Sequence, residues 1–235
     1  MNKYIIWIIS IIVFYGCNLK PKSNVFGNSS IKNVPFTENV LKEDVLSNLD
    51  SLNIKFQLRG NCYAYSSLKN SEEQNGEGRS DNLPQEVTSD FIRNGLYLTI
   101  NEKEHVKYTD SLLGCKLYLV NTTDSILSLK AVDSRLDIFI EAKDSDNRWK
   151  AISYLPYSSC GNSYHHVKLD RNEFWSFNIP VFNGNFKTKL RYVLDVNGWG
   201  KVVSNEMSCY LNKEQFDKER KQGYVNNNLM NPYKN

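Results

Sequence analysis

Apolar and polar residues alternate with a period of two along much of this chain, from about residue 91 to residue 212. Alternation of this kind is typical of β-strands that bury one face and leave the other in water. The clearest stretches are "LYLTI", "CKLYLVN", "LDIFIEAK", "FWSFNIPV", "KLRYVLDV" and "EMSCYLN". The residues predicted to face inward are Leu96, Leu98, Ile100, Cys115, Leu117, Leu119, Leu136, Ile138, Ile140, Ala142, Trp175, Phe177, Ile179, Val181, Leu190, Tyr192, Leu194, Val196, Met207, Cys209 and Leu211.

Turn-forming residues separate these stretches, at 121–124, 144–147, 183–185 and 197–198. Asn, Asp, Ser and Gly favour tight turns because they tolerate the required backbone conformations. Strands do not alternate with helices, so a parallel α/β sheet is disfavoured. The pattern therefore predicts an all-β fold, an antiparallel immunoglobulin-like two-sheet sandwich over residues 91–212.

The segments outside this region have less regular patterns. Residues 17–48 are polar and rich in Asn and Lys, which predicts a flexible tether. Residues 49–90 predict a short β-hairpin, turning at Arg59-Gly60-Asn61, followed by an exposed loop with Gly76, Gly78 and Pro84. Residues 213–235 predict a short helix and a tail.

The N-terminus has the features of an export signal. Lys3 precedes an apolar run of about twelve residues, too short to cross a bilayer, which takes ~20. We therefore predict a signal peptide over 1–16. Gly16 and Cys17 make it resemble a bacterial lipoprotein signal, although Phe14 stands where that family has Leu. The resemblance implies lipid attachment at Cys17, and two acyl chains would anchor the chain stably. An ordinary signal peptide or an uncleaved anchor is the alternative.

A wider resemblance rests on "VKYTDSLLGCKLYLVNTTDSILSL", "RWKAISYLPYSSCGNSYHHVKL", "FNGNFKTKLRYVL" and "SNEMSCYLNKEQF". These runs resemble uncharacterised Bacteroidetes-type envelope lipoproteins with an immunoglobulin-like β-sandwich domain. The first hairpin is also loosely similar to the BsuPI-type proteinase inhibitor family, from which we transfer no inhibitory function. The resemblance implies a membrane-anchored lipoprotein on the periplasmic or cell-surface face of a bacterial envelope, and it supplies no active site.

Charge and composition narrow the partners. The formal net charge is +3, and Lys and Arg are scattered rather than clustered with aromatic residues, so we predict no nucleic-acid partner. The expected partners are the membrane, through the N-terminal lipid, and an envelope protein or glycan that the sequence does not identify.

The remaining cysteines are Cys62, Cys115, Cys160 and Cys209. An even number in an exported chain is compatible with two disulfides, and free buried thiols are the alternative. Cys115 and Cys209 are both predicted to face inward, so they form one possible pair. Cys160 can reach Cys62 only if the predicted hairpin packs on the loop around Cys160.

The segment "YSSCGNSYHH", residues 157–166, gathers most of the candidate chemistry. Alternation into "VKL" turns His165 inward with Val167 and directs His166 to solvent, so the two cannot bind one ion. Cys160 and His165 are weak metal candidates, because zinc takes three or four protein ligands. We favour a structural loop and predict no metal ion and no cofactor.

Enzymatic sites find little support in the sequence. No serine lies in a G-x-S-x-G turn, and Ser158 or Ser159 is too close in sequence to the histidines for a nucleophile–base pair. Glu141, Glu173, Asp195 and Glu206 could supply the paired carboxylates of a glycosidase, but acids on exposed strand faces are common. The tryptophans that could stack on a sugar are Trp149, Trp175 and Trp199, and Trp199 is the one that we expect to be most exposed. We predict a non-catalytic binding or structural role. The alternatives are a carbohydrate-binding or glycan-processing accessory lipoprotein and a hydrolase with an unrecognised site.

Overall fold

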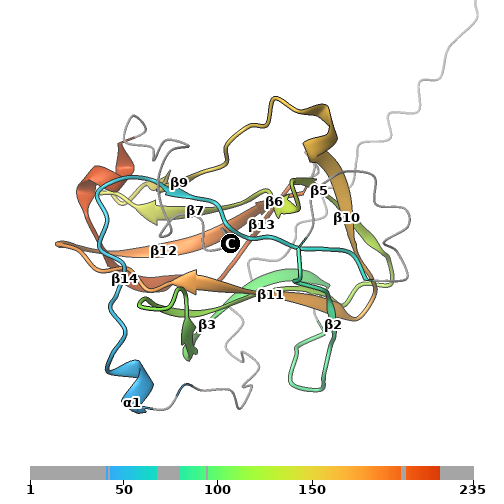
Figure 1. The fold of residues 1–235 in the computed structure, drawn as a ribbon, viewed down its shortest axis with the longest axis horizontal. Coiled ribbons are helices and arrows are strands. Elements are labelled where there is room, and N and C mark those ends of the chain that lie inside the picture. Colours follow the sequence, from blue (N-terminus) through green and yellow to red (C-terminus); the bar gives the residue numbers. More distant parts are fainter. Residues whose placement is uncertain (1–40, 42, 68–79, 94, 197–199, 218–235) are drawn as a thin grey trace, which may run out of the picture.

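The alternating stretches form the strands of an antiparallel β-sandwich, as predicted (Figure 1). The computed structural model describes residues 41, 43–67, 80–93, 95–196 and 200–217. One sheet has the order β2 (Gln85–Glu86), β11 (Glu173–Pro180), β4 (Leu113–Asn121), β3 (Leu96–Lys107). The other has the order β13 (Lys201–Val203), β12 (Phe186–Asp195), β7 (Ile138–Lys143), β8 (Trp149–Ala151), and β14 (Met207–Leu211) also pairs with β12.

The core lies between these sheets and is built from the residues that the alternation singles out. Leu117, for example, stands opposite Ile100 on one side and Phe177 on the other, and all three are buried. The predicted inward residues are all buried except Val181 and Val196, which are half-buried and pack against the core. The prediction of an all-β sandwich is therefore confirmed.

A second apolar cluster covers the outer face of the first sheet. Tyr118, Val120 and Phe174 point away from the main core, and Phe91, from the segment that follows β2, packs over them. The Phe91 and Phe174 rings lie 4.5 Å apart between centroids. Because both faces of β4 are covered, "CKLYLV" is more continuously apolar than a strand with one wet face.

The two sheets are joined at one corner by β5 (Leu127–Val132), β6 (Arg135–Leu136) and β10 (Tyr164–Leu169). The β5–β10 pair continues the β4–β11 pair beyond a bend, and the chain then runs from β6 into β7 of the second sheet. The side chain of Asn121 holds the bend, because its Nδ2 donates to Ser125 O, at 2.9 Å, and to Asp170 O, at 3.0 Å. Figure 1 shows β5 and β10 beside the sheets, at the right of the view.

Residues 50–66, which we call the strap, do not form the predicted hairpin. β1 (Leu58–Arg59) instead pairs in parallel with β9 (Ser153–Tyr154), and the strap also bonds to both sheets and to the corner. Leu52 N donates to Val181 O, and Ala64 N donates to Ser134 O, each at 2.8 Å. The apolar side chains that the strap adds to the core are Leu52, Ile54, Leu58, Cys62 and Ala64. The segment 49–90 is thus partly built into the sandwich.

The remaining described elements are short. They are α1 (Glu43–Leu46) and the 3₁₀ turns η2 (Gly161–Ser163) and η3 (Lys213–Phe216), and η3 lies at the start of the segment for which a short helix was predicted. Among the residues described, no helix is long and apolar enough to cross a membrane. The predicted signal peptide, Cys17 and the tail from residue 218 lie outside the described residues, as does most of the tether.

Candidate ligand-binding site

A tight turn at Asp133 and Ser134 shapes the corner between the sheets. Both residues have positive φ, 50° and 65°, as two-residue hairpin turns of this kind require. The turn connects β5 to β6 and sets Arg135 opposite Val132. On the other side of β5, β10 sets His165 opposite Ala131. Arg135 and His165, although distant in sequence, therefore flank the same strand.

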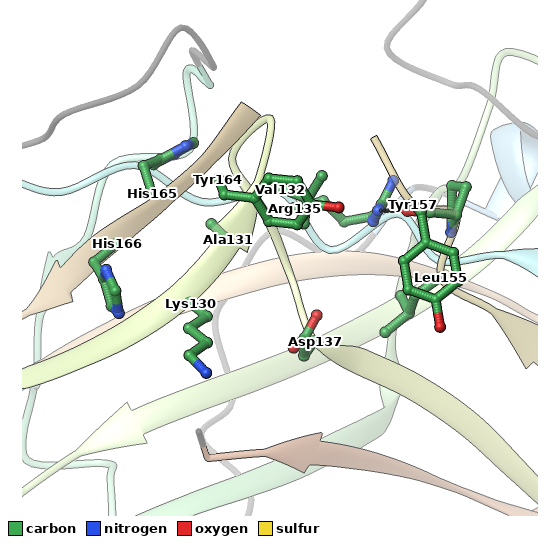
Figure 2. A pocket seen from close by; sticks show the side chains of 11 residues that line it. Lys130, Ala131, Val132, Arg135, Asp137, Leu155, Tyr157, Tyr164, His165 and His166 are labelled. Atoms are coloured by element: carbon green, nitrogen blue, oxygen red, sulfur yellow. Dashed lines mark hydrogen bonds between the residues drawn. The ribbon is translucent and has the colours of Figure 1, made fainter. Parts of the chain in front are cut away.

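A cavity of about 390 Å³ lies at this corner, and we call it the corner pocket (Figure 2). Its size falls within the ~300–1,000 Å³ of typical small-ligand sites. Its walls come from β5, β6, β10 and the segment after β9. The lining residues are Lys130, Ala131, Val132, Arg135, Asp137, Leu155, Pro156, Tyr157, Tyr164, His165 and His166.

A smaller cavity of about 210 Å³, the arginine hollow, adjoins the corner pocket. Both cavities are lined by Val132, Arg135, Pro156 and Tyr157, so one ligand can extend from one into the other. The other residues that line the hollow are Arg59 of the strap, Asp133 of the tight turn, and Ser158 and Ser159 of the segment after β9. Its lining residues come from three separate parts of the chain: the strap, the segment 132–135 and the segment 156–159.

His165 is a buried, hydrogen-bonded histidine in the pocket wall. Its Nδ1 lies 3.1 Å from Ser163 O, so Nδ1–H donates there, and Nε2 lies 3.4 Å from Ser134 Oγ. Burial lowers the pKa of His165, which keeps the ring neutral. His166 is exposed on the opposite face of β10, so the predicted division of the two histidines is confirmed.

The hydroxyl groups of Ser158, Ser163 and Tyr164 make hydrogen bonds within the segment "YSSCGNSYHH". Tyr164 Oη donates to Ser158 O at 3.0 Å, and the Ser158 and Ser163 hydroxyl oxygens lie 2.7 Å apart. These bonds close the loop onto β10, as expected of a structural loop. Tyr157 is 87% exposed and lies at the rim of both cavities.

The charged groups of the pocket are partly withdrawn from water. Arg135 is buried, and its Nη2 donates to Pro156 O at 2.7 Å, which holds the segment before Tyr157. Burial raises the pKa of Asp137, with Asp195 adding to the rise and Arg135 and Lys130 opposing it. Figure 2 shows Asp137 below Arg135, between Lys130 and Tyr157. The pocket therefore offers both donors and acceptors to a polar ligand.

The weak metal candidates are not brought into a ligand set. Cys160 is exposed in the loop, whereas His165 is buried with both ring nitrogens engaged. Across the described ranges, no three His, Cys, Asp or Glu side chains come together to hold an ion.

All four cysteines after Cys17 are free thiols, so neither possible disulfide is formed. Cys115 Sγ lies 4.0 Å from Met207 Sδ, and Cys209 is two residues further along β14, which is ~7 Å. Cys62 is part of the strap and is buried in the main core, whereas Cys160 is exposed. Burial raises the pKa of Cys115 and of Cys209 to about 12, as is typical of unreactive core thiols.

The acidic residues proposed for glycoside chemistry are spread over separate contacts. Glu141 accepts from Arg191, at 2.6 Å, on the second sheet, and Glu206, just before β14, accepts from Lys189, at 2.8 Å. Glu173 lies on the first sheet and accepts from Asp170 N. None of these three lines the corner pocket or the arginine hollow.

The tryptophans also serve structural contacts where they are described. Trp175 is in the core, as predicted, and its Nε1 donates to Tyr65 O of the strap at 3.0 Å. Trp149 begins β8 and lies 4.0 Å under the guanidinium of Arg191. Trp199 lies outside the described residues.

Comparison with known protein families and with curated proteins gives no match for this chain.

Arg59, Lys130, Arg135 and Asp137 line the two cavities but were not predicted as site residues. The run "KAVDSRLD" holds three of them around Asp133 and Ser134, and Asp and Ser are common turn residues. Arg59 gave no such signal, because it reaches the site only through the parallel pairing of β1 with β9.

Proposed function

We propose that this chain is a lipid-anchored envelope protein whose sandwich binds a saccharide in the corner pocket without transforming it. The observation that carries this proposal is the pocket itself, with the exposed ring of Tyr157 at its rim and polar side chains inside. The lipoprotein-like signal ending at Cys17 supports the anchoring.

A saccharide suits this lining better than a wholly apolar ligand. Sugar rings have apolar C–H faces, which pack on aromatic rings, and hydroxyl groups, which need donors and acceptors. Tyr157 and the half-exposed Tyr164 supply aromatic surface, and Asp137 and Lys130 supply polar atoms. These four residues come from different elements that the fold holds together.

The contact between Ser134 and His165 does not favour hydrolysis. Ser134 is fully buried, so its hydroxyl cannot reach a substrate in the pocket. A nucleophile must also approach the substrate within about 3.5 Å. The pair instead supports the tight turn beneath the pocket, which favours binding over catalysis.

Binding is tested with full-length protein in detergent, titrated calorimetrically with a panel of neutral and acidic oligosaccharides. We expect at least one oligosaccharide to bind unchanged and Tyr157→Ala to weaken its binding by about tenfold, a loss of ~1.4 kcal/mol. Tyr210→Ala is the matched control, because Tyr210 is also exposed but lies on β14. Binding of no saccharide, an equal effect of both substitutions, or cleavage of the ligand would overturn the proposal.

Anchoring is tested separately by Cys17→Ser. We expect the variant to incorporate no labelled fatty acid and to leave the membrane fraction. Continued labelling of the variant would show that Cys17 is not the attachment site.

A further inference from the structure

The two arginines of the arginine hollow have donors that the protein leaves unused. Arg59 Nε is buried and has no hydrogen-bond partner within the described part of the chain. Arg135 uses Nη2 for Pro156 O, which leaves other N–H groups of its guanidinium. Arg59 is half-buried and lines the hollow, so a ligand there can reach its guanidinium, for which the protein supplies too few acceptors.

The charge around the two cavities is also unbalanced. Lys130, Arg59 and Arg135 line them, against the acids Asp133 and Asp137. Neither arginine has a carboxylate of a described residue within ion-pair distance, in contrast to the Arg191–Glu141 pair on the second sheet. The geometry therefore leaves an anion-binding position open at the end of the pocket.

We propose that the arginine hollow binds the carboxylate of an acidic saccharide whose sugar rings occupy the corner pocket. This inference rests on the proposed function and names its ligand class. A guanidinium presents parallel N–H groups that match the two oxygens of a carboxylate. Tyr157 lines both cavities, so a sugar ring packed on Tyr157 can direct its carboxylate toward Arg59 and Arg135.

The test compares trigalacturonic acid with its methyl ester, which has the same sugar rings without the charge. We expect full-length protein in detergent to bind the acid at least about tenfold more tightly than the ester, as charge-assisted hydrogen bonds imply. Arg59→Gln should remove that preference. Arg59 has no side-chain hydrogen bond within the described residues, so this substitution should leave the melting temperature within a few degrees of the wild type.

Arg171→Gln is the matched control, because Arg171 is exposed on a different surface, beside Glu86 and Asn172. It should leave the preference for the acid unchanged. If the acid and the ester bind equally, the carboxylate inference is wrong and saccharide binding still stands. If the protein binds neither the acid nor the ester, and no other sugar, both proposals are wrong. If a hexaglutamate peptide competes as well as the sugar acid, the saccharide part is wrong.

Discussion

The strap is expected to belong to the same folding unit as the sandwich, and Leu58→Ala tests this. Leu58 is 1% exposed in the main core, and its backbone pairs with Ser153 of β9. Burying a leucine side chain contributes ~1.5–3 kcal/mol, and the cavity left by truncation adds to the loss. We therefore expect the free energy of unfolding to fall by ~3–4 kcal/mol.

Urea unfolding followed by tryptophan fluorescence measures this loss. Trp175 reports on the strap and the core together, because it is buried and its Nε1 donates to Tyr65 O. With an m-value of ~2 kcal/mol/M, the midpoint should fall by about 1.5–2 M urea in a single transition. Lys55→Ala is the control, since Lys55 is exposed on the same strap, and it should change stability by less than ~0.5 kcal/mol. Equal midpoints for the two variants, or an unchanged main transition, would refute the single-unit account.

Three further predictions concern other parts of the fold. Asn205 Oδ1 accepts from Ile100 N and its Nδ2 donates to Ile100 O, so Asn205→Asp, which loses the donor, should lower the free energy of unfolding by ~1–3 kcal/mol in urea titrations. Burial lowers the pKa of His165, so as the pH falls the histidine is protonated in the unfolded chain before it is protonated in the folded protein. The difference in free energy of unfolding between wild type and His165→Gln should therefore shrink as the pH falls below ~6.5. A difference that stays constant with pH would contradict this. In the native protein, a thiol reagent should label Cys160 rapidly and should label Cys62, Cys115 and Cys209 only after unfolding. If these cysteines stay unlabelled in protein that is unfolded without a reductant, they form disulfides instead.

The strands were predictable because each has one face buried in the main core. Met207, Cys209 and Leu211 alternate with exposed Ser208 and Tyr210, and the period gives both the strand and its inner face. The outer cluster was not predictable in this way, because Tyr118 is buried by Phe91, which comes from another part of the chain.

The strap and the pocket depend on contacts that no local pattern contains. Leu58 and Arg59 pair with Ser153 and Tyr154, and the pairing is parallel, so no tight turn marks it in the sequence. The predicted hairpin failed for this reason, since Gly60 continues the strap, with its N–H donating to Tyr154 O, instead of turning the chain. The pocket was missed because its arginines come together only once the strap is in place.

Hydrogen–deuterium exchange locates the binding site most directly. Full-length protein in detergent is compared with and without saturating trigalacturonic acid. The account predicts slower exchange in residues 130–137 and 155–166, with no change in residues 141–151, which include Trp149 on the second sheet. Protection confined to residues 141–151, or no protection of the corner at saturation, would contradict the claim that the corner pocket is the site.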